Sequence, residues 1–413
     1  MSQPRVELFP LRPAVRSDAP TTLDLLIKIT PPPAELNAPR PALNLGLVID
    51  RSGSMDSDKK IKYAREAAVY AVEQLLPTDR VSVTVFDGEV QTLVENAPAV
   101  DKSGIVAVIR RVVTGGSTAL HGGWREGGRQ VGGHRLAGGM NRVLLLSDGQ
   151  ANMGEQNPVA IAADVARLAA EGVSTTTMGL GDDYNEDLLE AMAQAGDGNY
   201  YYIESPQQLG GLFQTELHGL MATFGHAVRL AVEPQGGVTV ADVLNDFEPD
   251  PHGAGLKLPN LVAGMPILAV VRLNVPPRGE AGDVCRVRVS WLGPKQTARQ
   301  ELVVTLALPA VSSSAFDALP VAVEVQERAA LLLMARLKKQ ATFHSEQGDM
   351  AGTLRCLSDA KVLRMAAPQS PEMQQEADAF ALIEADLADG EIAKFSKRAK
   401  YQSHQTRSSK PRP

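Results

Sequence analysis

The middle of the chain alternates between short apolar runs and segments with the periodicity of amphipathic helices. The runs at 43–50 and 141–149 are almost continuously apolar, which is typical of strands buried on both faces. The segments 59–76 and 158–172 repeat their apolar residues at helical spacing. Repeated strand–helix units with short connections predict a mostly parallel sheet with helices on both faces. Further strands are predicted at 80–87, 90–96, 173–181 and 199–205, and further helices at 104–112, 185–196 and 207–224.

The sequences on both sides of this region have the pattern of β-strands. Two strand-like stretches, Arg5–Leu11 and Thr22–Thr30, precede a proline-rich break at 31–42. From 226 onward, short strands alternate with glycine and proline turns, which is typical of a β-sandwich. Four or five strands are few for a closed sandwich, so we expect the two early strands to join them. The α/β region would then be an insertion in one β-domain, whereas a separate N-terminal arm would contradict this interpretation.

The last part of the chain changes character again. Three segments between 320 and about 392 are helical in pattern, and the basic, polar stretch that follows is predicted to be a disordered tail. The predicted fold class is therefore α/β: a Rossmann-like doubly wound sheet inserted in or joined to a β-sandwich, with a C-terminal helical element. The expected boundaries are 1–40 for the N-terminal strands, 41–224 for the α/β domain, 225–312 for the β-sandwich, 313–393 for the helical element and 394–413 for the tail.

Composition narrows the class of protein. Of the 413 residues, 44% are hydrophobic, which is enough for a substantial core, and 4% are aromatic, which argues against a stacking surface for single-stranded nucleic acid. The net charge of −7 argues against polyanion partners. The start of the chain does not read as a signal peptide and no 18-residue apolar run occurs, so we expect a cytoplasmic protein without a membrane span. Cys285 and Cys356 are interpreted as buried thiols.

Oxygen-bearing side chains follow two of the predicted buried strands. Asp50, Ser52 and Ser54 come at the end of the first strand, and Asp148 comes at the end of the 141–149 run. A third loop contributes Thr118 just before a predicted helix. Ligands bind at the carboxyl edge of open α/β sheets, and carboxylates and hydroxyls suit Mg²⁺, Mn²⁺ or Ca²⁺ rather than zinc. Because few protein ligands would contact the ion, water or an acidic side chain of a partner must complete its shell.

These loops resemble those of the von Willebrand factor type A family. The matching residues are DRSGSM at 50–55, Thr118 in GGSTAL and Asp148 in LLLSDG, which together correspond to the family's metal-ion-dependent adhesion site. The resemblance implies that Ser52, Ser54 and Thr118 bind a divalent ion directly, with Mg²⁺ first and Mn²⁺ or Ca²⁺ as alternatives. It implies that Asp50 and Asp148 bind directly or through water. The resemblance covers about 43–222, and the layout of the whole chain is similar to the inter-alpha-trypsin-inhibitor heavy-chain group.

The same residues also allow simpler interpretations. The 50–54 loop could be a helix cap, the site could have lost metal binding, or Asp50 could be a phosphoacceptor. Ser147 lacks the surroundings of a hydrolase nucleophile. His121 is expected to be a loop histidine without function, and Asp182 and Asp183 to belong to a solvated loop. The glycines of 122–133 are expected to shape a loop and a loose helix near the metal.

The predicted function is a non-enzymatic, metal-dependent protein-binding module with no catalytic residues. The expected partner is a protein that offers an aspartate or glutamate carboxylate. Resemblance to intracellular bacterial members of the family implies assembly or signalling, with AAA+ ATPases or kinase and phosphatase systems as candidate partners. The alternatives are a metal-dependent phosphohydrolase and a structural scaffold in which the metal only stabilises the fold.

Overall fold

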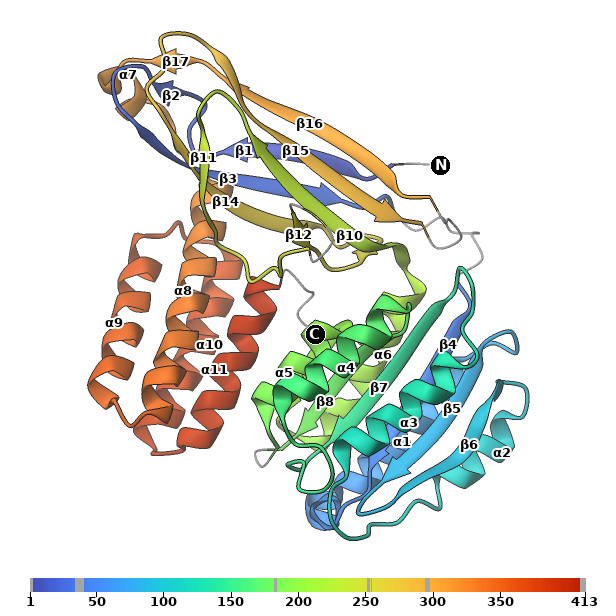
Figure 1. Cartoon of the computed structure of the whole chain (residues 1–413). Helices are drawn as coiled ribbons and strands as arrows, with labels where there is room; N and C mark the ends of the chain where they lie inside the picture. The colour runs from blue at the N-terminus through green and yellow to red at the C-terminus, as the bar shows by residue number, and fades with distance from the viewer. Residues whose placement is uncertain are drawn as a thin grey trace. The chain divides into compact units, whose positions relative to one another are not determined.

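The computed structural model describes residues 3–33, 41–181, 184–250, 253, 255–293 and 298–408. The chain divides into two compact units (Figure 1). One unit combines the residues before 37 with those from Phe224 onward, and the other is formed by 37–223. The second unit is therefore inserted in the sequence of the first.

The inserted unit is built on a six-stranded sheet in the order β6-β5-β4-β7-β8-β9. Figure 1 labels β6, β5, β4, β7 and β8 of this sheet. All neighbouring strands are parallel except the edge strand β6, which pairs antiparallel with β5. The central strands β4 and β7 are buried along their whole length, as their apolar runs predict. The strands are β4 Leu43–Asp50, β5 Arg80–Phe86, β6 Val90–Pro98, β7 Met140–Ser147, β8 Ser174–Leu180 and β9 Asp197–Ile203.

Helices cover both faces of this sheet. On one face, alternate residues of β4 such as Leu45 and Leu47 share a core with α1, α2 and α6. The other face carries α3, α4 and α5, and Asn185 caps α5 by accepting a hydrogen bond from the Leu188 amide. The helices are α1 Lys60–Gln74, α2 Lys102–Ile109, α3 Leu120–Gly132, α4 Pro158–Ala170, α5 Glu186–Ala195 and α6 Leu209–Met221, and two 3-10 turns, η1 Gly53–Lys59 and η2 Pro206–Gln208, precede α1 and α6.

The glycines of 122–133 do not form a loose helix, because α3 is regular and lies very close to the sheet. A Cβ atom added to Gly123 would lie 2.4 Å from the Phe86 ring, and one added to Gly127 would lie 2.2 Å from a Val48 methyl. These two glycines are four residues apart, so they share the face of α3 that contacts β4 and β5. The spacing that suggested a loop is thus a close-packing pattern.

Substituting Gly127 with alanine is expected to destabilise the inserted unit by about 1–3 kcal/mol, because the added methyl overlaps Val48 and outweighs the gain in helix propensity. The matched control is Gly132→Ala, whose Cβ would make an ordinary 3.6 Å contact with Leu168 and should not destabilise. Urea unfolding followed by Trp124 fluorescence measures both variants in a Trp291→Phe background. Equal stability of Gly127→Ala and Gly132→Ala would refute the predicted overlap between the added methyl and Val48.

The other unit contains a β-sandwich made from both flanks of the insertion. One sheet has the order β1-β3-β14-β11, and β3 pairs with β14 over nine residues from Thr21 to Ile29. The second sheet contains β12-β10-β15-β16, with β13 paired to β10, and the apolar faces of the two sheets share one core. The predicted fold class is therefore confirmed. The strands are β1 Arg5–Pro10, β2 Val15–Arg16, β3 Thr21–Thr30, β10 Thr223–Pro234, β11 Thr239–Val243, β12 Leu256–Lys257, β13 Leu261–Val262, β14 Ile267–Val275, β15 Gly282–Leu292, β16 Gln300–Leu308 and β17 Ala310–Val311.

The helical element of this unit begins at Ser313 and packs through α8 on the sheet that contains β3. Leu26 and Val270 form a small core with Val325 and Leu332 of α8. Cys285 and Cys356 are buried free thiols, as expected. Among the described residues, no helix has the length and apolar character needed to cross a membrane. The helices are α7 Ser313–Asp317, α8 Val323–Glu346, α9 Met350–Ala366, α10 Pro371–Ala388 and α11 Ile392–Arg407.

The expectation of a disordered tail from 394 is wrong for residues 394–407, which form most of α11. The positive charges that suggested disorder are paired with acidic residues of the same unit. Arg398 contacts Asp386 at 2.8 Å, Lys400 contacts Glu346 at 2.6 Å, and Arg407 contacts Asp246 at 2.7 Å. Phe395 and Ala399 are fully buried, so the segment is an amphipathic helix with few apolar anchors. Residues 409–413 lie outside the described residues.

Candidate metal centre

The two carboxylates of the predicted site meet at the carboxyl edge of the central strands. Asp50 is the last residue of β4, and Asp148 directly follows β7. The two strands are parallel neighbours, with Ile49 opposite Leu146, so their ends lie side by side. Both aspartates are fully buried. The sheet topology therefore brings together two residues that are far apart in the sequence.

Asp50 is oriented by hydrogen bonds on both of its oxygens. The Ser52 amide donates to Oδ1 at 2.8 Å, and the Ser147 hydroxyl donates to Oδ2 at 2.5 Å. Burial raises the pKa of Asp50 to about 6, although the hydrogen bonds from Ser147 and Ser52 act in the opposite direction. Ser147 was considered from the sequence only as a nucleophile. The structure shows it instead as a fully buried support for Asp50.

The two serines of the first loop lie next to the second carboxylate. Their hydroxyl oxygens are 3.2 Å apart, and the Ser54 hydroxyl donates to Asp148 Oδ1 at 2.8 Å. Ser52 is buried, whereas Ser54 is exposed. The cluster is therefore accessible from solvent on the side of Ser54.

The loop that carries Thr118 is held against the first loop by backbone hydrogen bonds. The Gly115 amide donates to the Arg51 carbonyl at 2.6 Å, and the Gly53 amide donates to the Gly116 carbonyl at 2.9 Å. The Thr118 amide donates to Asn152 Oδ1 at 2.8 Å, which links this loop to the one after β7. Asn152 was missed by the sequence reasoning, because an asparagine in a polar loop carries no distinguishing pattern.

The Thr118 and Ser54 hydroxyls both lie close to Gly149. A Cβ atom added at this position would lie 3.2 Å from Thr118 Oγ1 and 3.6 Å from Ser54 Oγ. The two hydroxyls thus border one small space that a side chain at 149 would partly fill. Ser54 joins this space to Asp148 and Ser52, and the Ser52 amide joins it to Asp50. The two carboxylates and three hydroxyls of this cluster are the oxygen donors that Mg²⁺, Mn²⁺ and Ca²⁺ prefer. The residues present therefore fit a hard divalent cation.

A metal site built from several His, Cys, Asp or Glu side chains has little support in the part of the chain that the structure describes. No group of three or more His, Cys, Asp or Glu side chains suited to a metal occurs there. His121 lies in α3, stacks on Trp124 and contacts Asp164 at 3.0 Å, so it has a structural environment. Asp182 and Asp183 lie outside the described residues.

A buried lysine beside the site escaped the sequence reasoning. Lys60 begins α1, and its ammonium lies 2.8 Å from Asp148 Oδ2. Its side chain is 8% exposed. The signal was present in the sequence, because residues 60, 64, 67 and 71 share one face of the helix and the other three are buried alanines.

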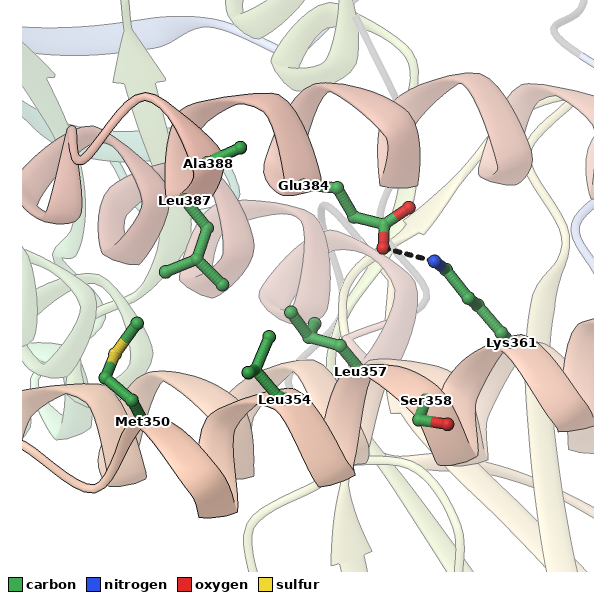
Figure 2. A pocket seen from close by; sticks show the side chains of 8 residues that line it. All are labelled: Met350, Leu354, Leu357, Ser358, Lys361, Glu384, Leu387 and Ala388. Atoms are coloured by element: carbon green, nitrogen blue, oxygen red, sulfur yellow. Dashed lines mark ion pairs between the residues drawn. The ribbon is translucent and has the colours of Figure 1, made fainter.

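A pocket in the other unit contains none of the predicted site residues. It lies between α9 and α10 and is mostly apolar, with one ion pair between Lys361 and Glu384 (Figure 2). None of its lining residues is a predicted cation ligand, and the pocket therefore has no part in the candidate metal centre. The lining residues are Met350, Leu354, Leu357, Ser358, Lys361, Glu384, Leu387 and Ala388.

The inserted unit is thus an open, doubly wound α/β domain that carries D-x-S-x-S, threonine and aspartate loops at the carboxyl edge of its sheet. The sequence model of the von Willebrand factor type A domain family matches residues 44–215. This part of the chain is therefore a von Willebrand factor type A domain, and the resemblance drawn from the three loops is confirmed.

Two curated relatives resemble part of the chain. The uncharacterized protein YfbK of Escherichia coli K12 is 29% identical over 194 residues, which are 47% of this chain and 34% of YfbK. Mouse inter-alpha-trypsin inhibitor heavy chain 4 is 31% identical over 171 residues, which are 39% of this chain and 18% of that protein. The chain thus matches about a third or less of the length of these relatives.

Two solved structures resemble nearly the whole chain. A von Willebrand factor type A protein from Catenulispora acidiphila has a TM-score of 0.70 at 16% identity and covers 92% of this chain and 89% of its own. The ArnB paralog VWA2 from Sulfolobus acidocaldarius has a TM-score of 0.66 at 16% identity and covers 100% of both chains. At this identity the likeness shows the fold, which extends over the β-sandwich and the helices as well as the inserted domain.

Proposed function

We propose that the inserted domain holds a divalent cation with Asp50, Ser52, Ser54, Thr118 and Asp148 and uses it to bind an acidic side chain of a protein partner. The observation that carries the proposal is the convergence of three loops on one space, with Ser54 exposed and the other four side chains buried. Mg²⁺ is the first candidate, and Mn²⁺ and Ca²⁺ have the same oxygen preference.

The residues of the site have separable roles. The Ser147 hydroxyl and the Ser52 amide fix the Asp50 carboxylate, and the backbone bonds between loops fix Thr118. A bound divalent cation would supply a coordination position to a carboxylate that approaches from solvent. The Met153 amide donates to the Thr118 carbonyl at 3.3 Å, and the Met153 side chain is 41% exposed. This apolar side chain would contact the partner around its acidic residue.

The two alternatives are less well supported by the same geometry. A phosphohydrolase needs a nucleophile or general base beside the metal, and Ser147 is fully buried with its hydroxyl donating to Asp50. A purely structural ion would have no need of an exposed ligand such as Ser54. We propose that the partner is a cytoplasmic protein, and AAA+ ATPases and kinase or phosphatase systems are the first candidates.

The first test is metal binding by the full chain. Calorimetry with Mg²⁺, Mn²⁺ and Ca²⁺ should show binding at one site, and Ser52→Ala combined with Ser54→Ala should weaken it by at least about 100-fold. The matched control is Ser57→Ala, an exposed serine in the same turn, which should leave the affinity unchanged. Wild-type protein that binds none of the three ions would end the proposal.

The second test is capture of partners from a lysate of the source organism with Mg²⁺ or with EDTA. Partners retained with Mg²⁺ and lost both with EDTA and with the double serine variant would support the proposal. Capture that ignores chelator and substitution would favour the scaffold. Phosphatase turnover that follows metal occupancy would favour the enzyme.

A further inference from the structure

Asp148 is shared between the predicted metal ligands and a buried cation. Its Oδ1 accepts the Ser54 hydroxyl at 2.8 Å, and its Oδ2 accepts the Lys60 ammonium at 2.8 Å. The exposed fractions of the two charged side chains are 8% for Lys60 and zero for Asp148. An ion pair this deeply buried is weakly screened by solvent, so its charge acts on whatever else binds there.

The ammonium group and the hydroxyls lie against different loops. A Cβ atom added to Gly181, at the end of β8, would be 3.3 Å from Lys60 Nζ. A Cβ atom added to Gly149 would instead be 3.2 Å from Thr118 Oγ1 and 3.6 Å from Ser54 Oγ. Lys60 therefore binds Asp148 Oδ2 from the side of β8. Asp148 Oδ1 stays on the side of the Ser54 and Thr118 hydroxyls. Lys60 is an additional charge beside the site rather than a substitute for the cation.

This charge changes the electrostatic balance of the loaded site. Asp50 and Asp148 together neutralise one divalent cation, and the hydroxyls carry no charge. Counted over the residues that the structure describes, Lys60 then leaves a net charge of about +1 in a largely buried cluster, which is costly without an anion. The nearby Arg51 does not alter this balance, because it is paired with Asp87 at 3.3 Å.

We propose that Lys60 is a specificity-determining residue that weakens binding of the cation alone and makes the loaded site select an anionic ligand. A carboxylate at the open position would neutralise the excess charge, whereas water would not. The cation and the partner's carboxylate therefore bind cooperatively, with Lys60 as the source of the coupling. This inference rests on the proposed function and adds a selection rule to it.

The test uses the full chain with Mn²⁺ as the cation and acetate as the carboxylate probe. The Mn²⁺ dissociation constant is measured by electron paramagnetic resonance in chloride and in acetate buffers of equal ionic strength. Acetate should tighten Mn²⁺ binding to the wild type by several-fold. Lys60→Met should bind Mn²⁺ about 10-fold more tightly in chloride and should lose most of the acetate effect.

Two further variants separate charge from structure. Lys59→Met removes the same charge from the exposed neighbouring residue and should behave as wild type. Lys60→Gln keeps a hydrogen-bond donor but removes the charge, so it should behave as Lys60→Met and replaces it if that variant does not fold. Wild-type protein whose Mn²⁺ affinity is indifferent to acetate would overturn the inference without any variant.

The outcomes also distinguish this inference from the proposed function. If the wild type binds no Mn²⁺ in either buffer, the proposed metal site fails. If the wild type binds Mn²⁺ and both Lys60 variants match Lys59→Met, the metal site stands and the role of Lys60 is refuted. Weaker Mn²⁺ binding by both Lys60 variants would equally refute it, since Lys60 would then only hold Asp148 in place.

Discussion

Replacing Arg142 with methionine is expected to lower the free energy of unfolding of the inserted domain by about 3–5 kcal/mol. The Arg142 guanidinium lies 2.6 Å from Glu216 Oε1, and both side chains are almost fully buried. The substitution would leave the Glu216 carboxylate buried without its cation. Removing one member of a buried ion pair is strongly destabilising because the remaining charge has no partner. Replacing the whole pair with apolar residues usually costs much less.

The surroundings of Glu216 support an ionised carboxylate in the native protein. Burial acts to raise its pKa, but Arg142 and the hydrogen bonds from Asn199, Thr176 and Tyr201 outweigh burial and hold the pKa below its ordinary value. Asn199 donates at 2.6 Å and Tyr201 at 2.9 Å to Oε2, and Thr176 donates at 2.7 Å to Oε1. The pair connects β7 to α6, the last helix of the domain.

Urea unfolding in the Trp291→Phe background isolates this effect. The protein has two tryptophans, and Trp124 lies in the inserted domain whereas Trp291 lies in β15 of the other unit. The control Arg135→Met removes an exposed arginine 3.6 Å from Glu171 and should cost less than about 1 kcal/mol. Equal losses in the two variants would contradict the buried-pair argument.

The pH dependence has a definite sign. In the wild type, the lowered pKa of Glu216 contributes stability that is present above the unfolded value of about 4.5 and is lost as the pH falls through the folded value. In Arg142→Met the pKa of Glu216 should be raised, so stability is present below the unfolded value and is lost as the pH rises. The deficit of the variant should therefore be larger at pH 7.5 than at pH 5.

Asp148→Asn is expected to have two large effects at once. It removes one of the two carboxylates of the site, so divalent-cation affinity should fall by at least about 100-fold. It also leaves the Lys60 ammonium buried beside a neutral amide, which should destabilise the domain by about 3–5 kcal/mol. Calorimetry measures the first effect, and Trp124 fluorescence in urea measures the second.

Two companion variants separate these effects of Asp148→Asn. Adding Lys60→Met removes the uncompensated charge and should restore part of the stability without restoring cation binding. Thr118→Val removes a predicted ligand and no charge, so it should weaken cation binding with little loss of stability. A fully stable Asp148→Asn protein would show that Lys60 is not buried as an ion pair.

The sequence predicted the sheet, and it predicted that Asp50, Ser54 and Asp148 meet at its carboxyl edge, because both depend on local patterns. Continuous apolar runs identified β4 and β7, and the polar residues at their ends follow from strand order alone. The support around the site was not predicted, since Ser147 and Asn152 are ordinary loop-edge residues whose partners are set by tertiary contacts. Whether the five residues bind an ion stays a prediction.

The two wrong predictions, for α11 and for α3, have a common physical cause. The sequence of α11 predicts a disordered tail because basic residues without visible partners favour disorder, whereas Arg398, Lys400 and Arg407 find acidic partners only in the folded unit. The glycines of α3 predict a loop and a loose helix when they are considered locally, because their closeness to Phe86 and Val48 is a tertiary property. Charge and glycine content describe a segment in isolation, and both were overridden by packing.

The pairing of β3 with β14 sets the order in which the protein can fold during synthesis. More than two hundred residues separate Thr30 from Ile267, so β3 waits on the order of ten to fifty seconds at typical translation rates. The inserted domain is complete before β14 emerges and can fold first. Meanwhile β3 carries Leu25, Leu26 and Ile27, all fully buried in the finished protein, without its sandwich partner. The nascent β1–β3 segment therefore exposes an unpaired apolar strand for longer than the inserted domain needs to be synthesised, and chaperone binding is expected there.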